Sequence, residues 1–175
     1  MNRRRLLTAL AGLGLTGGSL LAVSQGLPGG SGGLSVRVET VDAAGSEAGQ
    51  LSLPVRGQPV TVVDLFATWC APCSEQMEAL GAVHREYGDR AAFVSVTNER
   101  VGGTLTRADI REWWQRHDGN WTVGLDPESD LMAALGADGL PYLAVVDRSG
   151  TVHWEHAGLV EAATLRDRLD RHLEA

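Results

Sequence analysis

The passage from an apolar run at residues 60–67 into the motif Trp-Cys-Ala-Pro-Cys at residues 69–73 constrains the fold most strongly. The run is rich in β-branched residues and has the length of a strand, which indicates a buried strand. Residues 74–87 then carry apolar side chains at helical spacing. The motif is therefore predicted to lie where a strand ends and a helix begins.

Cys70 and Cys73 are the only cysteines in the 175-residue sequence. At a helix start the first N–H groups are unpaired and the positive end of the dipole favours an anion. We therefore expect the thiol of Cys70 to be acidified and exposed, and Cys73, one turn into the helix, to be more buried and less acidic. Pro72 fits the first turn, which does not need its missing N–H. Spacing and placement together predict a reversible dithiol–disulfide centre.

Other uses of two cysteines are less well supported. A structural zinc site usually needs four ligands, and none of the five histidines forms a ligand motif beside this pair. A purely structural disulfide would close a very small loop, where cross-linking contributes little. Binding of Cu(I) by two thiolates stays open as an alternative. We predict redox chemistry carried by the disulfide itself, with no metal and no organic cofactor.

The charge of the chain argues against nucleic acid as a partner. All 15 basic residues are arginines, against 22 acidic residues. Residues 1–24 hold three of these arginines and no acid, so the remainder carries 12 arginines and a net charge of −10 (12 − 22). Such a chain has no basic patch that would neutralise phosphates.

The N-terminus resembles a targeting segment. An Arg-Arg-Arg run at residues 3–5 precedes an apolar, glycine-rich stretch at residues 6–23, as in a twin-arginine export signal. We predict a signal at residues 1–24, either cleaved or retained as a membrane tether through residues 6–23. A glycine-rich linker is expected at residues 25–33 and one domain at residues 34–175. The predicted location is the outer face of the cytoplasmic membrane or the extracellular space.

The rest of the pattern predicts an α/β fold in which a mixed sheet has helices on both faces. Strands are expected at residues 34–41, 50–55, 60–67, 91–97, 120–125, 142–147 and 151–155, and helices at 74–87, from 106 to about 117, at 126–136 and at 161–173. The tryptophans at 113, 114, 121 and 154 are interpreted as core or rim, and His153 and His156 as exposed or hydrogen-bonded.

These motifs resemble the thioredoxin superfamily, and within it the exported TlpA/ResA-like branch, over residues 34–173. Residues 69–73 match the signature Trp-Cys-x-Pro-Cys, and Leu140-Pro141 resembles the cis-proline of the family. In the family that proline lies against the active-site disulfide, and the backbone before it pairs with the substrate. The resemblance implies a thioredoxin fold with an N-terminal β-hairpin extension. It also implies that Trp69, Pro72, Leu140 and Pro141 contact the substrate.

Asp64 is a lone acid in the apolar run. Burial of an unpaired carboxylate is costly and should raise its pKa. Asp64 precedes Cys70 by six residues, as the buried aspartate of thioredoxins precedes the first cysteine. The resemblance implies that Asp64 exchanges a proton with Cys73. The alternative interpretation is an acid at a strand edge, paired with an arginine.

The chain departs from the branch at three positions. Gln76 and Glu78 stand where the branch often has a glutamate and a helix-kinking proline, so any role of that glutamate would fall to Asp64 or be absent. Tyr142 follows the proline where the family usually has threonine, which predicts a reshaped substrate groove.

The resemblance implies an exported protein-disulfide oxidoreductase. Its substrates would be cysteine-containing exported proteins, for example a cytochrome c apoprotein, and its electrons would come from a membrane dithiol donor. Ala71-Pro72 lacks the histidine that stabilises the thiolate in oxidising relatives, which favours a reductant over an oxidant. The alternatives are a thiol oxidase of the same fold, a copper-handling module with Met77 as the candidate further ligand, and a non-catalytic interaction domain.

Overall fold

A computed structural model describes residues 33–173 of the chain. The signal predicted at residues 1–24, with its apolar stretch at residues 6–23, lies outside the described residues, as does the linker predicted at residues 25–33 apart from Gly33. Within the described part, no helix has the length and apolar character needed to cross a membrane.

The described residues form one seven-stranded mixed sheet in the order β2-β1-β5-β4-β3-β6-β7. The strands are β1 (Val36–Thr40), β2 (Gly49–Leu53), β3 (Val60–Phe66), β4 (Ala92–Thr97), β5 (Thr122–Leu125), β6 (Tyr142–Asp147) and β7 (Val152–Ala157). Strands β3, β4 and β5 run parallel, whereas β6 pairs antiparallel with β3. The predicted mixed sheet is confirmed.

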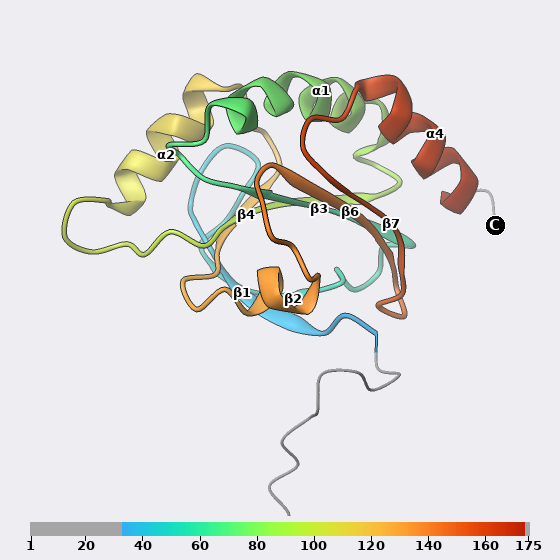
Figure 1. The fold of residues 1–175 in the computed structure, drawn as a ribbon, viewed down its shortest axis with the longest axis horizontal. Coiled ribbons are helices and arrows are strands. Elements are labelled where there is room, and N and C mark those ends of the chain that lie inside the picture. The colour runs from blue at the N-terminus through green and yellow to red at the C-terminus, as the bar shows by residue number, and fades with distance from the viewer. Residues whose placement is uncertain (1–32, 174–175) are drawn as a thin grey trace, which may run out of the picture. The chain divides into compact units, whose positions relative to one another are not determined.

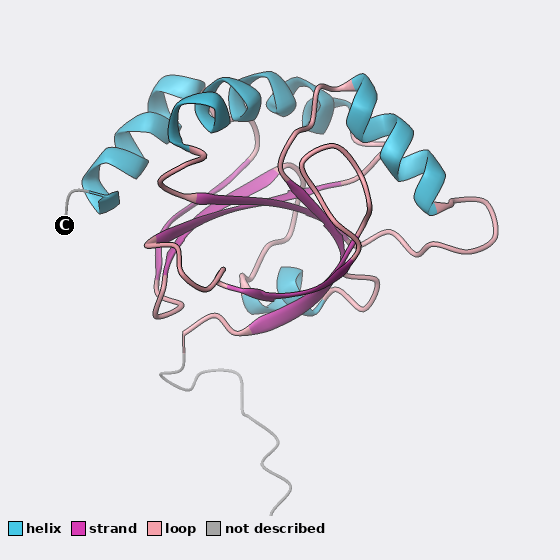
Figure 2. Ribbon diagram, turned by 180° about the vertical axis from the view of Figure 1, so that it is seen from behind, coloured by secondary structure: helices cyan, strands magenta, loops and turns pink. Residues whose placement is uncertain are grey.

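Helices cover both faces of the sheet, as predicted, but unequally (Figures 1 and 2). The described helices are α1 (Ala71–Tyr87), α2 (Arg107–Arg116), α3 (Asp130–Ala134) and α4 (Ala162–Leu173). Figure 1 shows α1, α2 and α4 side by side over one face, while the short α3, drawn in orange, lies at the opposite face. The sheet therefore separates a large core under three helices from a smaller one next to α3.

Every residue of β3 is buried, because this strand lies inside the sheet with a core on each side. Val62 and Phe66 face the core under α1, whereas Val63 and Leu65 face the core next to α3. Side chains alternate along a strand, so Asp64 points toward the α1 side with Val62 and Phe66. The strand thus brings an acid beneath the helix that begins at the cysteine motif.

The N-terminal hairpin is present and continues the main sheet. Strand β1 pairs antiparallel with β2, with Val38 opposite Leu51, and on its other side with β5, with Glu39 opposite Leu125. The predicted extension is therefore part of the same sheet, with β2 at its edge and β1 next to it.

Helix α3 is shorter than the helix predicted over residues 126–136. Pro127 follows Asp126 in a turn, and Ser129 has left-handed backbone angles (φ 60°), which delay the helix until Asp130. The carboxylate of Asp126 accepts hydrogen bonds from the N–H groups of Asp130 and Leu131, at 3.0 and 2.8 Å. Asp126 thus caps a helix that begins four residues later.

Aromatic side chains fill the core between α1, α2 and the sheet. Trp113, Trp114 and Trp121 are all buried, and Trp113 stacks on Phe66 with ring centroids 4.7 Å apart. Their interpretation as core residues is confirmed. His153 is exposed and hydrogen-bonded to Asp147, as the sequence suggested.

Candidate active site

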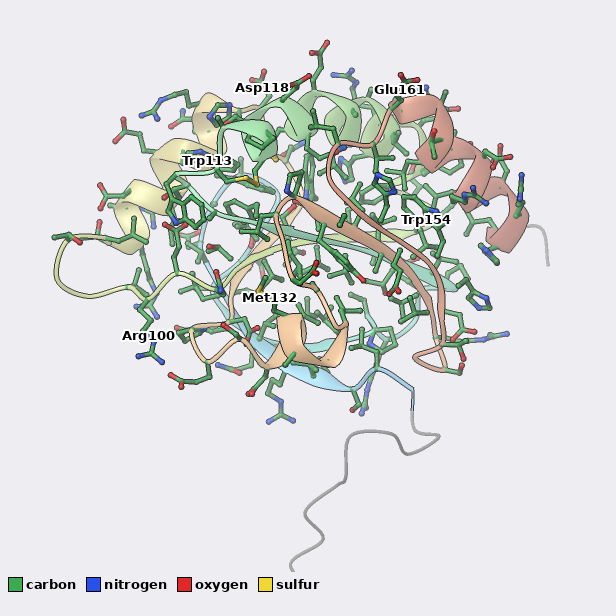
Figure 3. The ribbon with its side chains drawn as sticks, in the orientation of Figure 1. Arg100, Trp113, Asp118, Met132, Trp154 and Glu161 are labelled. Carbon is green, nitrogen blue, oxygen red and sulfur yellow. A yellow bond between two sulfur atoms is a disulfide. The ribbon has the colours of Figure 1, made fainter. Side chains whose placement is uncertain are left out.

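The turn after β3 places the two cysteines at the start of α1. Cys70 is the N-cap, in extended backbone (φ −87°, ψ 102°), and the helix begins at Ala71, three residues earlier than predicted. The N–H of Cys73 donates a hydrogen bond to Sγ of Cys70, at 3.2 Å. The two residues are joined in a disulfide with Cα atoms 5.2 Å apart, seen as a yellow bond in Figure 3. In the reduced form, the helix start and the N–H of Cys73, which points at the sulfur of Cys70, both favour a thiolate at Cys70.

Cys70 is less exposed than predicted. It is 5% exposed, against 2% for Cys73, so the expected order holds but the expectation of an exposed Cys70 is wrong for the disulfide form. The bond turns the sulfur of Cys70 toward Cys73, and both join the core cluster under α1. The exposed group at this site is Trp69, whose side chain is 74% exposed.

A groove of about 460 Å³ lies beside the disulfide. Its lining residues are Trp69, Cys70, Ala71, Pro72, Asn98, Met132, Asp138, Gly139 and Leu140. Figure 3 shows Met132 with α3 and Trp113 with α2, on opposite sides of the sheet, so the groove reaches from the disulfide toward the α3 side. Sequence reasoning identified Trp69, Pro72 and Leu140, but missed Asn98, Met132 and Asp138.

The predicted cis bond between Leu140 and Pro141 is present. Leu140 lines the groove, whereas Pro141 is buried and its carbonyl accepts a hydrogen bond of 2.8 Å from the N–H of Gly158. Together they bring the loop before β6 and the loop after β7 to the active-site end of the sheet.

Tyr142 does not reshape the groove. It is 5% exposed and packs in the core next to α3, because it takes the opposite face of β6 from Leu143. Its hydroxyl donates to the carbonyl of Leu135 at 3.1 Å and lies 2.7 Å from the carboxylate of Glu155. Burial and the contact with Glu155 raise the pKa of Tyr142. The prediction of a reshaped groove is wrong.

Asp64 is buried inside the sheet, with 2% of its surface exposed. Its Oδ2 accepts a hydrogen bond of 2.7 Å from the hydroxyl of Ser95. Burial raises the pKa of Asp64 to about 7, and the hydrogen bond from Ser95 partly opposes that rise. Strand β3 is internal, and no ion pair joins Asp64 to an arginine within residues 33–173, so the alternative of a paired acid at a strand edge is wrong.

Ser95 is a functional candidate that the sequence reasoning did not single out. It lies directly opposite Asp64 in the parallel pair of β3 and β4, and it is completely buried. The available signal was a hydroxyl in the apolar run at residues 91–97, on a strand expected to lie inside the sheet.

Glu99 holds the segment that leads into the cysteine motif. Its carboxylate accepts hydrogen bonds from the N–H and the hydroxyl of Thr68, at 2.7 and 2.8 Å, and from the hydroxyl of Thr97, at 3.0 Å. These contacts fix the residue before Trp69 to the end of β4. Nothing in the local pattern predicts this, because the partners are far apart in sequence.

Glu99→Gln is expected to destabilise the protein by about 2 kcal/mol, since an amide nitrogen cannot accept the bonds that a carboxylate oxygen accepts. Urea unfolding measures the change. The control is Glu128→Gln, whose ion pair with Arg100 is exposed (73% for the arginine and 71% for the glutamate) and should contribute less than about 1 kcal/mol. Equal losses in the two variants would contradict the anchoring role.

Gln76 ties α1 to the loop before α4. Its amide nitrogen donates to the carbonyl of Val160 at 3.0 Å, and its oxygen accepts from the N–H of Val160 at 2.7 Å. Gln76 is 2% exposed, so both bonds are sheltered from water. A glutamate, as in the TlpA/ResA-like pattern, has no donor for this carbonyl when ionised. Gln76 therefore has a structural role at the place where the family pattern suggested a titrating group.

Gln76→Ala should lower the free energy of unfolding by about 3 kcal/mol, because it leaves both polar groups of Val160 buried without partners. Gln115→Ala, at an exposed position on α2, is the matched control and should change stability by less than about 0.5 kcal/mol. Chemical denaturation measures both. A loss below about 1 kcal/mol for Gln76→Ala would mean that water replaces the amide.

Side chains that could bind a metal ion do not cluster in the described part of the chain. Residues 33–173 hold no group of three or more histidine, cysteine, aspartate or glutamate side chains that could bind a metal ion. Met77, the candidate copper ligand, is 3% exposed and belongs to the core under α1. The absence of a metal or organic cofactor stays a prediction.

The sheet order, the helix that starts at a Cys-x-x-Cys disulfide and the cis-proline loop beside it define a thioredoxin fold. The Redoxin family model matches residues 35–168, and the chain belongs to this family. The predicted membership of the thioredoxin superfamily is confirmed.

Similar proteins agree with this assignment. A thiol:disulfide interchange protein DsbE of Allochromatium vinosum is 27% identical over 59% of this chain and 54% of its own length. The thiol-disulfide oxidoreductase ResA of Geobacillus thermodenitrificans is 21% identical over 69% of this chain and 64% of its own length. The pneumococcal exposed lipoprotein thioredoxin Etrx1 of Streptococcus pneumoniae superposes with a TM-score of 0.65 at 22% identity, over 79% of this chain and 99% of its own. The chain thus spans less than two thirds of either sequence relative.

Proposed function

We propose that this protein is an exported thiol–disulfide oxidoreductase that reduces disulfides in other exported proteins. One observation carries the proposal: a disulfide caps a helix beside an open groove, and a buried carboxyl whose pKa is near 7 lies beneath that helix. The proteins DsbE and ResA, which resemble this chain, support the reaction class.

The reaction begins with the reduced pair. Cys70, as thiolate, attacks one sulfur of a client disulfide; a new S–S bond forms to Cys70, and the other client sulfur leaves as a thiolate that takes up a proton. The N-cap position and the N–H of Cys73 stabilise the attacking anion. Trp69, Pro72 and Leu140 give the client segment apolar contacts along the groove.

Cys73 then resolves the mixed disulfide. Its thiol gives a proton to the carboxylate of Asp64, and its sulfur attacks Sγ of Cys70, so that the client leaves with both sulfurs reduced. A carboxyl with a pKa of about 7 is part ionised at neutral pH and suits both directions of this transfer. Two electrons pass to the client, and Cys70–Cys73 returns to the disulfide.

The surroundings of the pair favour a reductant. Ala71-Pro72 supplies no cation, and the one charged residue among those lining the groove is Asp138, an acid. A carboxylate disfavours a nearby thiolate, and a less stable thiolate makes the reduced pair a better electron donor. A dithiol donor in the membrane would re-reduce the disulfide, and cysteine-bearing cytochrome c apoproteins are one client class.

Export is proposed from the N-terminal pattern. The arginine run and apolar stretch resemble a twin-arginine signal, which would carry the domain across the membrane and leave it cleaved or tethered. Etrx1, whose fold this chain shares, is described as an exposed lipoprotein, which supports a location outside the cytoplasm.

Reduction of insulin, with dithiothreitol as electron donor, tests the activity. The protein should accelerate precipitation of the insulin B chain well above the rate with dithiothreitol alone. A rate equal to that background would contradict the proposal.

A further inference from the structure

Three buried polar groups form a directed chain that ends on Asp64. The indole N–H of Trp121 donates to Oγ of Ser95 at 2.9 Å, and Oγ of Ser95 lies 2.7 Å from Oδ2 of Asp64. Asp64 is 2% exposed, Ser95 0% and Trp121 4%. An indole nitrogen only donates, so the hydroxyl of Ser95 accepts from Trp121 and gives its single proton to Asp64.

This hydrogen-bond chain makes the two oxygens of Asp64 unequal. Oδ2 is held by Ser95, whereas Oδ1 is buried and forms no hydrogen bond with any residue between 33 and 173. A buried polar atom without a partner calls for a physical explanation, and one explanation is a catalytic role. The side chain of Asp64 points to the face covered by α1, the helix that carries Cys73.

We propose that Ser95 and Trp121 are positioning residues for the transfer of a proton from Cys73. They hold Oδ2 of Asp64 and so leave Oδ1 as the oxygen that takes the proton from the thiol, while the sulfur of Cys73 forms its bond to Cys70. This inference rests on the proposed function and adds two residues to it.

The same surroundings also set the pKa of the Asp64 carboxyl. Burial raises the pKa of Asp64 and the Ser95 hydrogen bond lowers it, so the pair keeps the carboxyl ionisable near neutral pH. Other titratable side chains lie on the elements packed over this face: Cys70, Cys73, His84 and Tyr87 from α1, His117 at the end of α2, and Asp170 on α4. Leu143, the neighbour on β6, is apolar. In the disulfide form, the causes of the Asp64 shift are burial and, opposing it, the hydrogen bond from Ser95.

His84 is the titratable side chain next to Trp121, with ring centroids 5.2 Å apart. Partial burial lowers the pKa of His84, which disfavours a positive charge on its imidazole. The donor-to-acceptor direction of the hydrogen-bond chain from Trp121 to Asp64 is therefore set by the hydrogen bonds themselves rather than by a nearby charge.

Two measurements test the inference on Ser95→Ala. Carbon-13 NMR of the Asp64 carboxyl in the disulfide form should show its pKa raised by about one unit, as expected for loss of a hydrogen bond to a charged group. With Ellman's reagent and the reduced protein, release of the second thionitrobenzoate follows attack by Cys73. The pH at which this rate is half-maximal should move up by the same amount.

Two further variants complete the design. Trp121→Phe removes the N–H that orients Ser95, and it should move both midpoints in the same direction by less; it also serves if Ser95→Ala does not fold. Ser46→Ala is the matched control, because Ser46 is also buried but its hydroxyl bonds only the backbone of Val123. Ser46→Ala should leave both midpoints unchanged.

The outcomes separate the inference from the proposed function. An unchanged pKa of Asp64 in Ser95→Ala and Trp121→Phe would overturn the positioning role. A raised pKa with an unmoved rate profile would overturn the link to the thiol of Cys73. If Asp64→Asn kept the wild-type rate profile, the proton-accepting role of Asp64 itself would fall, whatever the NMR result for Ser95→Ala.

Discussion

Replacing Cys70 with serine is expected to reduce disulfide exchange to the uncatalysed background, while replacing Cys73 with serine should trap the client on the enzyme. A serine hydroxyl cannot form a disulfide, so Cys70→Ser removes the attacking group. In Cys73→Ser the first attack proceeds, but no thiol follows to expel the client. The reaction then stops at a mixed disulfide on Cys70.

Non-reducing electrophoresis and intact-mass analysis of each variant with a disulfide-bonded client measure this difference. Cys73→Ser should accumulate an adduct with one client per protein, and the double variant Cys70→Ser/Cys73→Ser should accumulate none. Trapping by Cys70→Ser instead would show that Cys73 is the attacking residue. The 5% and 2% exposures of the two cysteines make that a genuine test, because both sulfurs are sheltered in the disulfide form.

Asp64→Asn is expected to stabilise the disulfide form by about 4 kcal/mol at about pH 8. Burial raises the pKa of Asp64 from 3.8 to about 7 in the folded protein. Between these values the folded state binds more protons than the unfolded state, so wild-type stability falls as pH rises. Below the lower value both states are protonated and the penalty vanishes. Asparagine carries no charge, so the variant lacks this pH dependence.

Denaturant unfolding of the wild type and of Asp64→Asn at a series of pH values gives two curves of unfolding free energy against pH. The difference between the curves isolates the contribution of Asp64. The curves should converge near about pH 4 and separate steadily toward about pH 8. Asp89→Asn, which removes an exposed carboxylate, controls for the loss of one negative charge from an acidic chain. A constant difference across this range would mean that Asp64 titrates normally in the folded protein. The same substitution should slow resolution by Cys73, so stability and activity change in opposite directions.

Much of this fold was predictable because its signals are local. The strand into the motif and the apolar run of β6 each arise from neighbouring residues. The cysteine pair and Asp64 could be identified for the same reason, since an acid in an apolar strand and a pair spaced by three residues are visible without a structure.

What the sequence did not reveal depends on contacts between distant segments. Glu99 reaches Thr68 across 31 positions, and Trp121 reaches Ser95 across 26. Met132 lines the groove from α3, whereas the cysteine pair lies at the start of α1, far away in sequence. The burial of Cys70 follows from the disulfide and the core beneath α1, which helix-start electrostatics does not describe.

The reduction potential of the Cys70–Cys73 pair decides between a reductant and an oxidant. Equilibration of the protein with mixtures of oxidised and reduced dithiothreitol or glutathione, followed by thiol quantification, gives the value. We expect a potential near about −270 mV, as in thioredoxin, because no cation in the groove stabilises the thiolate. A potential near about −120 mV would make the pair a dedicated oxidant and reverse the proposed direction. A pair that does not cycle would contradict the redox function itself.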